Sequence, residues 1–102
     1  MAKNVKTKAK LERHFTQRWS DRYPDVRMPP IEWIVHQIRN NGKDVQPAGR
    51  QSIVRSRFIL SVDGVRVPII YDTKRGTVVT ALPRHILNDL RRDTHDGQKI
   101  KL

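Results

Sequence analysis

Residues 55–72, RSRFILSVDGVRVPIIYD, decide the fold, because they have the pattern of two strands joined by a tight turn. Asp63-Gly64 is a strong signal for a two-residue hairpin turn, and apolar residues recur at every second position on both sides of it. Such a turn fixes the register, since it pairs Val62 with Val65 and each residue further out with its counterpart. One face then forms the core, and the other mixes aliphatic residues with three arginines. These arginines are Arg55, Arg57 and Arg66.

The sequence after the hairpin continues the sheet. A second turn at residues 73–76 leads to a third strand over residues 77–82, which Pro83 closes. Residues 84–92 have the pattern of a short last helix. Before the hairpin, residues 43–52 contain Pro47 and Gly49 and are expected to form a loop that could include a short edge strand.

Two amphipathic helices precede that loop. The first is expected over residues 9–23, where Pro24 ends a stripe of apolar residues spaced by four. The stripe consists of Leu11, Phe15, Trp19 and Tyr23. The second follows Pro30, has apolar residues at i, i+3, i+4 and i+7 from Ile31, and ends with Gly42 as a left-handed cap.

This order of elements predicts an α+β fold. Two N-terminal helices pack on one face of a small antiparallel meander of three strands, and a short C-terminal helix follows. We expect residues 11–92 to form a single domain. Residues 1–10 are expected to be a basic flexible tail and residues 93–102 a flexible polar tail.

The composition favours an anionic partner. The chain of 102 residues has 21 Lys and Arg against 10 Asp and Glu, a formal net charge of +11. This surplus extends into the expected domain, which favours a basic face over a basic arm alone. The absence of cysteine excludes disulfides and thiolate metal sites. With no apolar leader and no apolar span, we expect a cytoplasmic protein with no membrane partner, no metal and no cofactor.

The first helix carries the residues that are best suited to catalysis. His14, Arg18 and Arg22 form an i, i+4, i+8 row that overlaps the apolar stripe instead of lying opposite to it. Histidine can carry a proton near neutral pH, and arginine can stabilise a charged phosphorane, so together they suit metal-free RNA cleavage. For Arg22, an arginine whose stem crosses the rim of the core is an equal alternative.

The sheet adds candidates on the face with the arginines. Arg55 lies opposite Asp72 in the expected register, which predicts an ordinary cross-strand ion pair. Arg57 has no acidic neighbour there and could bind a phosphate or be solvated. Thr80 could be a strand hydroxyl near the site, but a slip of one residue at the second turn would reverse its face.

Two segments resemble a known family. They are residues 12–22, ERHFTQRWSDR, with an H-x3-R-x3-R pattern, and residues 65–83, VRVPIIYDTKRGTVVTALP. They resemble the barnase–EndoU–colicin–RelE superfamily of small metal-independent ribonucleases, in its colicin-D-like toxin or phage type. The resemblance implies an endoribonuclease in which His14 is the acid/base, Arg18 and Arg57 bind phosphate, and Thr80 is the strand hydroxyl.

The chain departs from that family in two respects. The expected meander has three strands where the superfamily has four or more, and a second acid/base residue is missing, with Tyr71 and His85 the only nearby candidates. Two alternatives to the endoribonuclease therefore stay open: a non-catalytic nucleic-acid-binding protein, and a small phage-type regulator that binds a host protein. RNA is the expected partner, and an inhibitor or host protein is a further one. The expected RNA-binding residues are Arg22, Arg55, Arg66, Lys74, Arg75 and Arg84.

Overall fold

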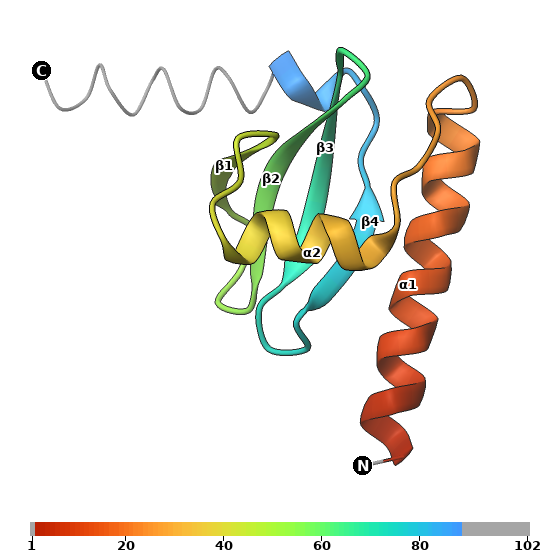
Figure 1. Cartoon of the computed structure of the whole chain (residues 1–102). Coiled ribbons are helices and arrows are strands. Elements are labelled where there is room, and N and C mark those ends of the chain that lie inside the picture. The colour runs from red at the N-terminus through yellow and green to blue at the C-terminus, as the bar shows by residue number, and fades with distance from the viewer. Residues whose placement is uncertain (1, 89–102) are drawn as a thin grey trace, which may run out of the picture.

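Four antiparallel strands form one sheet, and each pairs with its neighbour in the sequence, in the order β1-β2-β3-β4 (Figure 1). The computed structural model describes residues 2–88, with side chains from residue 8 onward. The strands are β1 (Val45–Arg50), β2 (Arg55–Val62), β3 (Val65–Asp72) and β4 (Thr77–Ala81). The helices are α1 (Ala2–Arg22) and α2 (Ile31–Arg39). The expected α+β fold, with two helices before an antiparallel meander, is confirmed.

The central hairpin has the register that its turn predicts. Every pair from Arg55 with Asp72 to Val62 with Val65 is present. Asp63 and Gly64 have φ angles of 51° and 80°, as a turn with two left-handed residues requires. The register therefore follows from the dipeptide at the turn and from the alternation of apolar residues beside it.

The meander has four strands instead of three, because the edge strand that residues 43–52 could include is present. Residues 45–50 pair with β2 and form β1 at the edge of the sheet. The register shifts between Pro47 and Arg50, and Gly49 has a φ of 93° within this irregularity. Proline and glycine are tolerated in an edge strand at such a bulge, which is why a sequence that suggests a loop can still pair.

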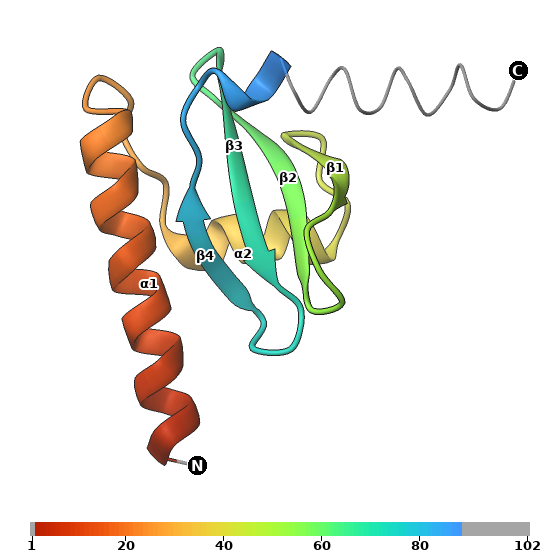
Figure 2. The same ribbon diagram turned by 180° about the vertical axis from the view of Figure 1, so that it is seen from behind.

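Both helices bury apolar stripes, and α2 crosses one face of the sheet (Figure 1). Seen from behind, the opposite face of the sheet is free of both helices, and α1 runs along the β4 side (Figure 2). We call the face without helices the outer face. The buried core between the helices and the sheet contains Phe15, Trp19, Tyr23, Val26, Ile34, Ile38, Leu60, Val67, Ile69, Tyr71, Val78 and Ala81.

Three hydrogen bonds tie α1 to β4 and to the residue after it. Arg22 Nη1 donates to the carbonyl of Ala81 at 2.6 Å, and the Tyr23 hydroxyl donates to the carbonyl of Leu82 at 2.6 Å. Further along the helix, Thr77 Oγ1 donates to the Glu12 carboxylate at 2.6 Å. Glu12, Arg22 and Tyr23, the residue after the helix, therefore hold α1 against β4 from one end of the strand to the other.

The helix boundaries differ from the expected ones. Helix α1 begins at Ala2, so residues 2–10, expected to be a flexible tail, have a helical backbone. Alanine and lysine favour helix, and the packed part of α1 supplies the nucleus from which these turns extend. At the end of α2, the left-handed residue is Asn41, with a φ of 51°, instead of Gly42. Asparagine tolerates this conformation better than most residues.

A smaller apolar cluster lies apart from the main core. Ala48 of β1 and Ile59 of β2 pack against Ile86 and Leu87. Residues 86–88 begin the expected short last helix, whose remainder and the expected tail over residues 93–102 lie outside the described residues. Within the described part of the chain, no helix is long and apolar enough to cross a membrane.

Candidate nucleic-acid interface

Two arginines, Arg55 and Arg75, contact one buried carboxylate at the end of the sheet where β2 begins and β3 ends, and two more, Arg50 and Arg57, lie beside them on β1 and β2. Asp72 Oδ1 accepts a hydrogen bond from the backbone N–H of Arg75 at 2.8 Å, and its Oδ2 accepts one from Arg75 Nη1 at 3.1 Å. Arg55 Nε lies 3.7 Å from the same Oδ2, so the expected Arg55–Asp72 ion pair is confirmed. We call Arg50, Arg55, Arg57 and Arg75 the arginine cluster.

Asp72 is a fixed anion within this cluster. The side chain is fully buried, whereas the side chains of Arg55 and Arg75 are 40% and 39% exposed. Burial by itself raises the pKa of Asp72, but the hydrogen bonds and the charge of Arg75 outweigh it, so the pKa lies below its usual value. The carboxylate is therefore ionised at neutral pH and holds two guanidinium groups that remain open to solvent.

Arg57 extends the arginine cluster toward β1. Its Nη2 donates to the carbonyl of Arg50 at 3.1 Å, and its Nε is buried with no hydrogen-bond partner among the described residues. The guanidinium lies against Gly49, where a Cβ atom would be 3.1 Å from Nη2. A buried donor without an acceptor is uncommon in folded proteins and costs stability, which marks Arg57 as a candidate for binding an anion.

The two loops at this end of the sheet are hydrogen-bonded to each other. The backbone N–H and the hydroxyl of Thr73 both donate to the carbonyl of Val54, at 2.7 and 3.0 Å. This joins the β1–β2 loop to the β3–β4 turn at the end of the sheet nearest the N-terminus of α1 (Figure 1). Lys74 is exposed in that turn and adds a further positive charge.

The residues expected to be catalytic are not brought together. His14 is exposed on α1, and Arg18 on the same helix forms an ion pair with Asp21 at 3.9 Å. Arg57 lies on β2, and β3 lies between β2 and β4, the strand that contacts α1. Two strand spacings amount to about 10 Å. Among the described residues, no hydrogen bond or ion pair connects His14, Arg18 and Arg57.

Thr80 shares the outer face with Arg57, because Ile70 is paired with both residues. The two side chains therefore lie in one row across the sheet but two strands apart. The candidates for a second acid/base do not join this row. Tyr71 is buried in the core, and His85 is exposed beyond the end of β4.

Two of the expected RNA-binding arginines are engaged at the α1–β4 boundary. Arg22 is half-buried and donates to the carbonyl of Ala81, which agrees with the interpretation as an arginine at the rim of the core. The guanidinium of Arg84 lies 5.3 Å from the centre of the Tyr23 ring, within the range of a cation–π interaction. Both groups have structural contacts that do not need an anion.

Arg66 lies apart from the arginine cluster, toward the other end of the hairpin. It is paired with Ser61 beside the Asp63-Gly64 turn, and its Nη2 donates to Gln46 Oε1 at 3.0 Å. The expected RNA-binding residues are thus divided between three places. Only Arg55, Arg75 and Lys74 lie with Arg57 at one end of the sheet.

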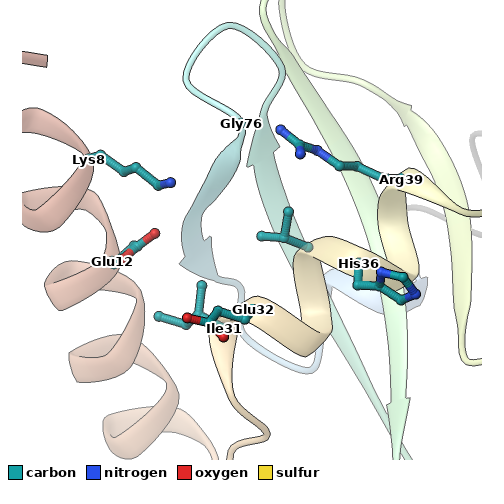
Figure 3. Close-up of a pocket in the computed structure, with 8 residues that line it drawn as sticks. Lys8, Glu12, Ile31, Glu32, His36, Arg39 and Gly76 are labelled. Atoms are coloured by element: carbon teal, nitrogen blue, oxygen red, sulfur yellow. The ribbon is translucent and has the colours of Figure 1, made fainter. Parts of the chain in front are cut away.

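A second feature lies between α1, α2 and the β3–β4 turn (Figure 3). It is a pocket of about 290 Å³ with charges of both signs, which we call the mixed-charge pocket. Its lining residues are Lys8, Glu12, Ile31, Glu32, Val35, His36, Arg39 and Gly76. The sequence pattern did not predict this pocket, but it contains one signal of it: at 100° per residue, Glu12 falls inside the sector of the apolar stripe, where a carboxylate needs a partner.

No model of a protein family matches the chain, and neither a curated protein nor a solved structure is significantly similar to it. Within residues 8–88, no group of three or more His, Asp or Glu side chains is placed to hold a metal ion.

Proposed function

We propose that the protein is an RNA-binding protein that holds single-stranded RNA by its phosphates on the arginine cluster. The observation that carries this proposal is the group of four arginines at one end of the sheet, in which the buried Asp72 carboxylate holds Arg55 and Arg75 and the Nε of Arg57 has no acceptor. Guanidinium groups bind phosphate through two parallel hydrogen bonds, and a cluster fixed in advance loses little entropy on binding.

Asp72 explains how the cluster can exist without RNA. Four like charges at one end of the sheet repel one another, and the ionised carboxylate that contacts Arg55 and Arg75 offsets part of that repulsion. It leaves a net positive charge on the surface, because only one of the groups is anionic. Backbone phosphates, each with one negative charge, would offset the remaining positive charge and would offer the Arg57 guanidinium a further acceptor.

Binding is favoured over cleavage by the distribution of the proton carriers. Metal-free cleavage needs an acid and a base within hydrogen-bond reach of the reacting phosphate. His14 lies on α1, beyond β4, and none of the histidines of residues 8–88 belongs to the end of the sheet that holds the arginine cluster. The ribonuclease that the family resemblance implies is therefore the competing function, and a cleavage assay decides between them.

The binding test uses a salt series with two matched double variants. We measure the affinity for a fluorescein-labelled single-stranded RNA by anisotropy between 50 and 200 mM salt. Four phosphate contacts predict a slope of about −2.8 in log K against log salt, a loss of about 50-fold over this range. The Arg50→Gln/Arg57→Gln variant should lose two contacts, with a slope of about −1.4 and a loss of about sevenfold.

The control changes the net charge equally at another place. Arg27 and Lys43 are exposed residues of the loops before and after α2, so Arg27→Gln/Lys43→Gln removes two charges away from the arginine cluster. It should keep the wild-type slope. Equal slopes for the two double variants would show that only the total charge matters and would contradict the proposed site. DNA of the same sequence tests the preference for RNA.

The cleavage test uses the same RNA with EDTA present. We expect the RNA to remain intact, and we expect His14→Ala to bind as the wild type does. Metal-independent cleavage that His14→Ala abolishes would instead establish the endoribonuclease. An absence of affinity for RNA at low salt would contradict both RNA functions, and the regulator that binds a host protein would be the remaining hypothesis.

A further inference from the structure

The mixed-charge pocket contains an anchored carboxylate. Glu12 Oε2 accepts a hydrogen bond from the hydroxyl of Thr77, a fully buried residue at the start of β4, at 2.6 Å. No other hydrogen bond or ion pair reaches this carboxylate within the described residues. In Figure 3 the Glu12 side chain points from α1 into the space between the two helices. Thr77 thus fixes the carboxylate through one lone pair of Oε2, so Oε1 and the second lone pair of Oε2 are available to a ligand.

Two cations flank the pocket. Arg39 extends from α2 toward the β3–β4 turn, and Lys8 reaches in from α1 on the other side (Figure 3). The Arg39 guanidinium comes so close to Gly76 that a Cβ atom there would lie 2.8 Å from Nη2. Neither cation forms an ion pair within the part of the chain that the structure describes.

These groups define a ligand with two unlike ends. Lys8 and Arg39 can bind a negatively charged group of a ligand. The Glu12 carboxylate only accepts hydrogen bonds, so it can bind a part of the ligand that carries N–H or O–H donors. Ile31 and Val35 of α2 add an apolar surface to the same pocket. A nucleotide has this combination, with a phosphate, a flat base and an edge of donors, and a volume of about 290 Å³ suits one nucleotide.

We propose that the mixed-charge pocket binds one unstacked guanine nucleotide of the bound RNA. A carboxylate can accept two parallel hydrogen bonds, and guanine is the one standard base that presents two adjacent donors on one edge, N1–H and the 2-amino group. Glu12 accepts these two bonds, and Lys8 or Arg39 contacts the phosphate. This inference rests on the proposed RNA binding and adds a base preference to it.

The pocket and the arginine cluster share one turn. Arg75 of the cluster and Gly76 of the pocket are consecutive residues, and Arg75 hydrogen-bonds Asp72 on one side while Arg39 approaches Gly76 on the other. A single strand that crosses this turn can therefore contact both. Phosphate binding would give affinity, and the pocket would select the base.

The experiment compares three RNAs that differ at one base. Each has the same length and a uridine background, with a single guanine, inosine or adenine at the centre. Inosine lacks only the 2-amino group, so it removes one of the two hydrogen bonds to Glu12. We expect the wild-type protein to bind the guanine RNA about tenfold more tightly than the inosine RNA, as one hydrogen bond to a charged group predicts.

A pair of variants assigns the preference to Glu12. Glu12→Gln keeps an oxygen that can accept from Thr77 but places a donor in the pocket, and it should bind all three RNAs equally. Asp25→Asn removes a carboxylate from an exposed loop and should retain the preference. The inosine comparison uses the wild-type protein, so it does not depend on how a variant folds.

The two proposals fail in different ways. Equal affinity of the wild type for the three RNAs, with the salt slope intact, would overturn the guanine pocket and leave the arginine cluster in place. A guanine preference that Glu12→Gln retains would also overturn the pocket. The absence of salt-dependent binding would overturn the proposed function and this inference together.

Discussion

Replacing Asp72 with Asn tests whether the buried carboxylate holds the arginine cluster together. Asn has nearly the same shape, so the change removes the charge and leaves the packing of β3 almost unaltered. Its Oδ1 can still accept from the backbone N–H of Arg75, but its amide group places donors against Arg75 Nη1 and Arg55 Nε. The variant therefore leaves two guanidinium groups without their anion.

The expected loss of unfolding free energy is about 2 kcal/mol. A hydrogen bond to a charged group contributes about 1.5–3 kcal/mol, and the Arg75 Nη1 bond is of this kind. The Arg55 pair, at 3.7 Å and with its arginine 40% exposed, adds about 0.5 kcal/mol. Solvent reaches both arginines, so the larger penalties of a wholly buried unpaired charge do not apply.

The pH dependence separates this charge effect from a packing defect. Because the pKa of Asp72 is lowered in the folded state, its contribution to stability is present above the unfolded pKa of about 3.9 and is lost as the pH falls through the folded pKa. The difference in unfolding free energy between the wild type and Asp72→Asn should be largest at pH 7. It should shrink steadily below pH 4.

Urea unfolding followed by tryptophan fluorescence measures this difference. Trp19 is buried and donates from its Nε1 to the carbonyl of Val26 at 2.8 Å, so its emission should report the loss of the core. A difference below about 0.5 kcal/mol at pH 7, or one that stays constant down to pH 3, would refute the role of Asp72 as the anion of the arginine cluster. The same variant should also weaken RNA binding, because Arg55 and Arg75 would no longer be held in place.

Three further changes test other parts of the structure. Tyr23→Phe removes the hydrogen bond to the Leu82 carbonyl and should lower the unfolding free energy by about 1 kcal/mol, as measured in urea. Gly76→Ala introduces a side chain at a φ of 67° and displaces Arg39, so it should cost about 1 kcal/mol and weaken the guanine preference, while the phosphate contacts of the arginine cluster remain. His14→Ala changes an exposed residue and should alter neither stability nor RNA affinity. A clear loss of affinity would show that α1 contacts the RNA, which would contradict a site confined to the sheet end.

The parts of the fold that follow from local sequence were predictable. The hairpin needs only the Asp63-Gly64 turn and a period of two, and the core stripe of α1 needs only the spacing of Phe15, Trp19 and Tyr23. Strand β1 was not predictable in the same way, because Pro47 and Gly49 indicate a loop and the pairing with β2 is a tertiary effect. The start of α1 at Ala2 was missed because residues 2–10 carry no apolar stripe.

The candidate site shows the same limit. The Arg55–Asp72 pair follows from the register of one hairpin and could be predicted, whereas the Arg75 bonds to Asp72 depend on the conformation of the next turn. The direction of Arg57 depends on Gly49, which lies at the bulge of the edge strand β1. The mixed-charge pocket needs the relative placement of two helices and a turn, which no local pattern supplies.

The hydrogen bonds from α1 to β4 have a consequence for the behaviour of the protein at high concentration. An edge strand with free carbonyl and N–H groups is a template on which another copy can add a strand, and this is how many sheets aggregate. At one edge, α1 covers β4, and Arg22 occupies the carbonyl of Ala81. At the other, Pro47 and the bulge interrupt β1. Loss of α1 would therefore expose a pairing edge, and the shortened chain would assemble through β4 instead of remaining a smaller soluble domain.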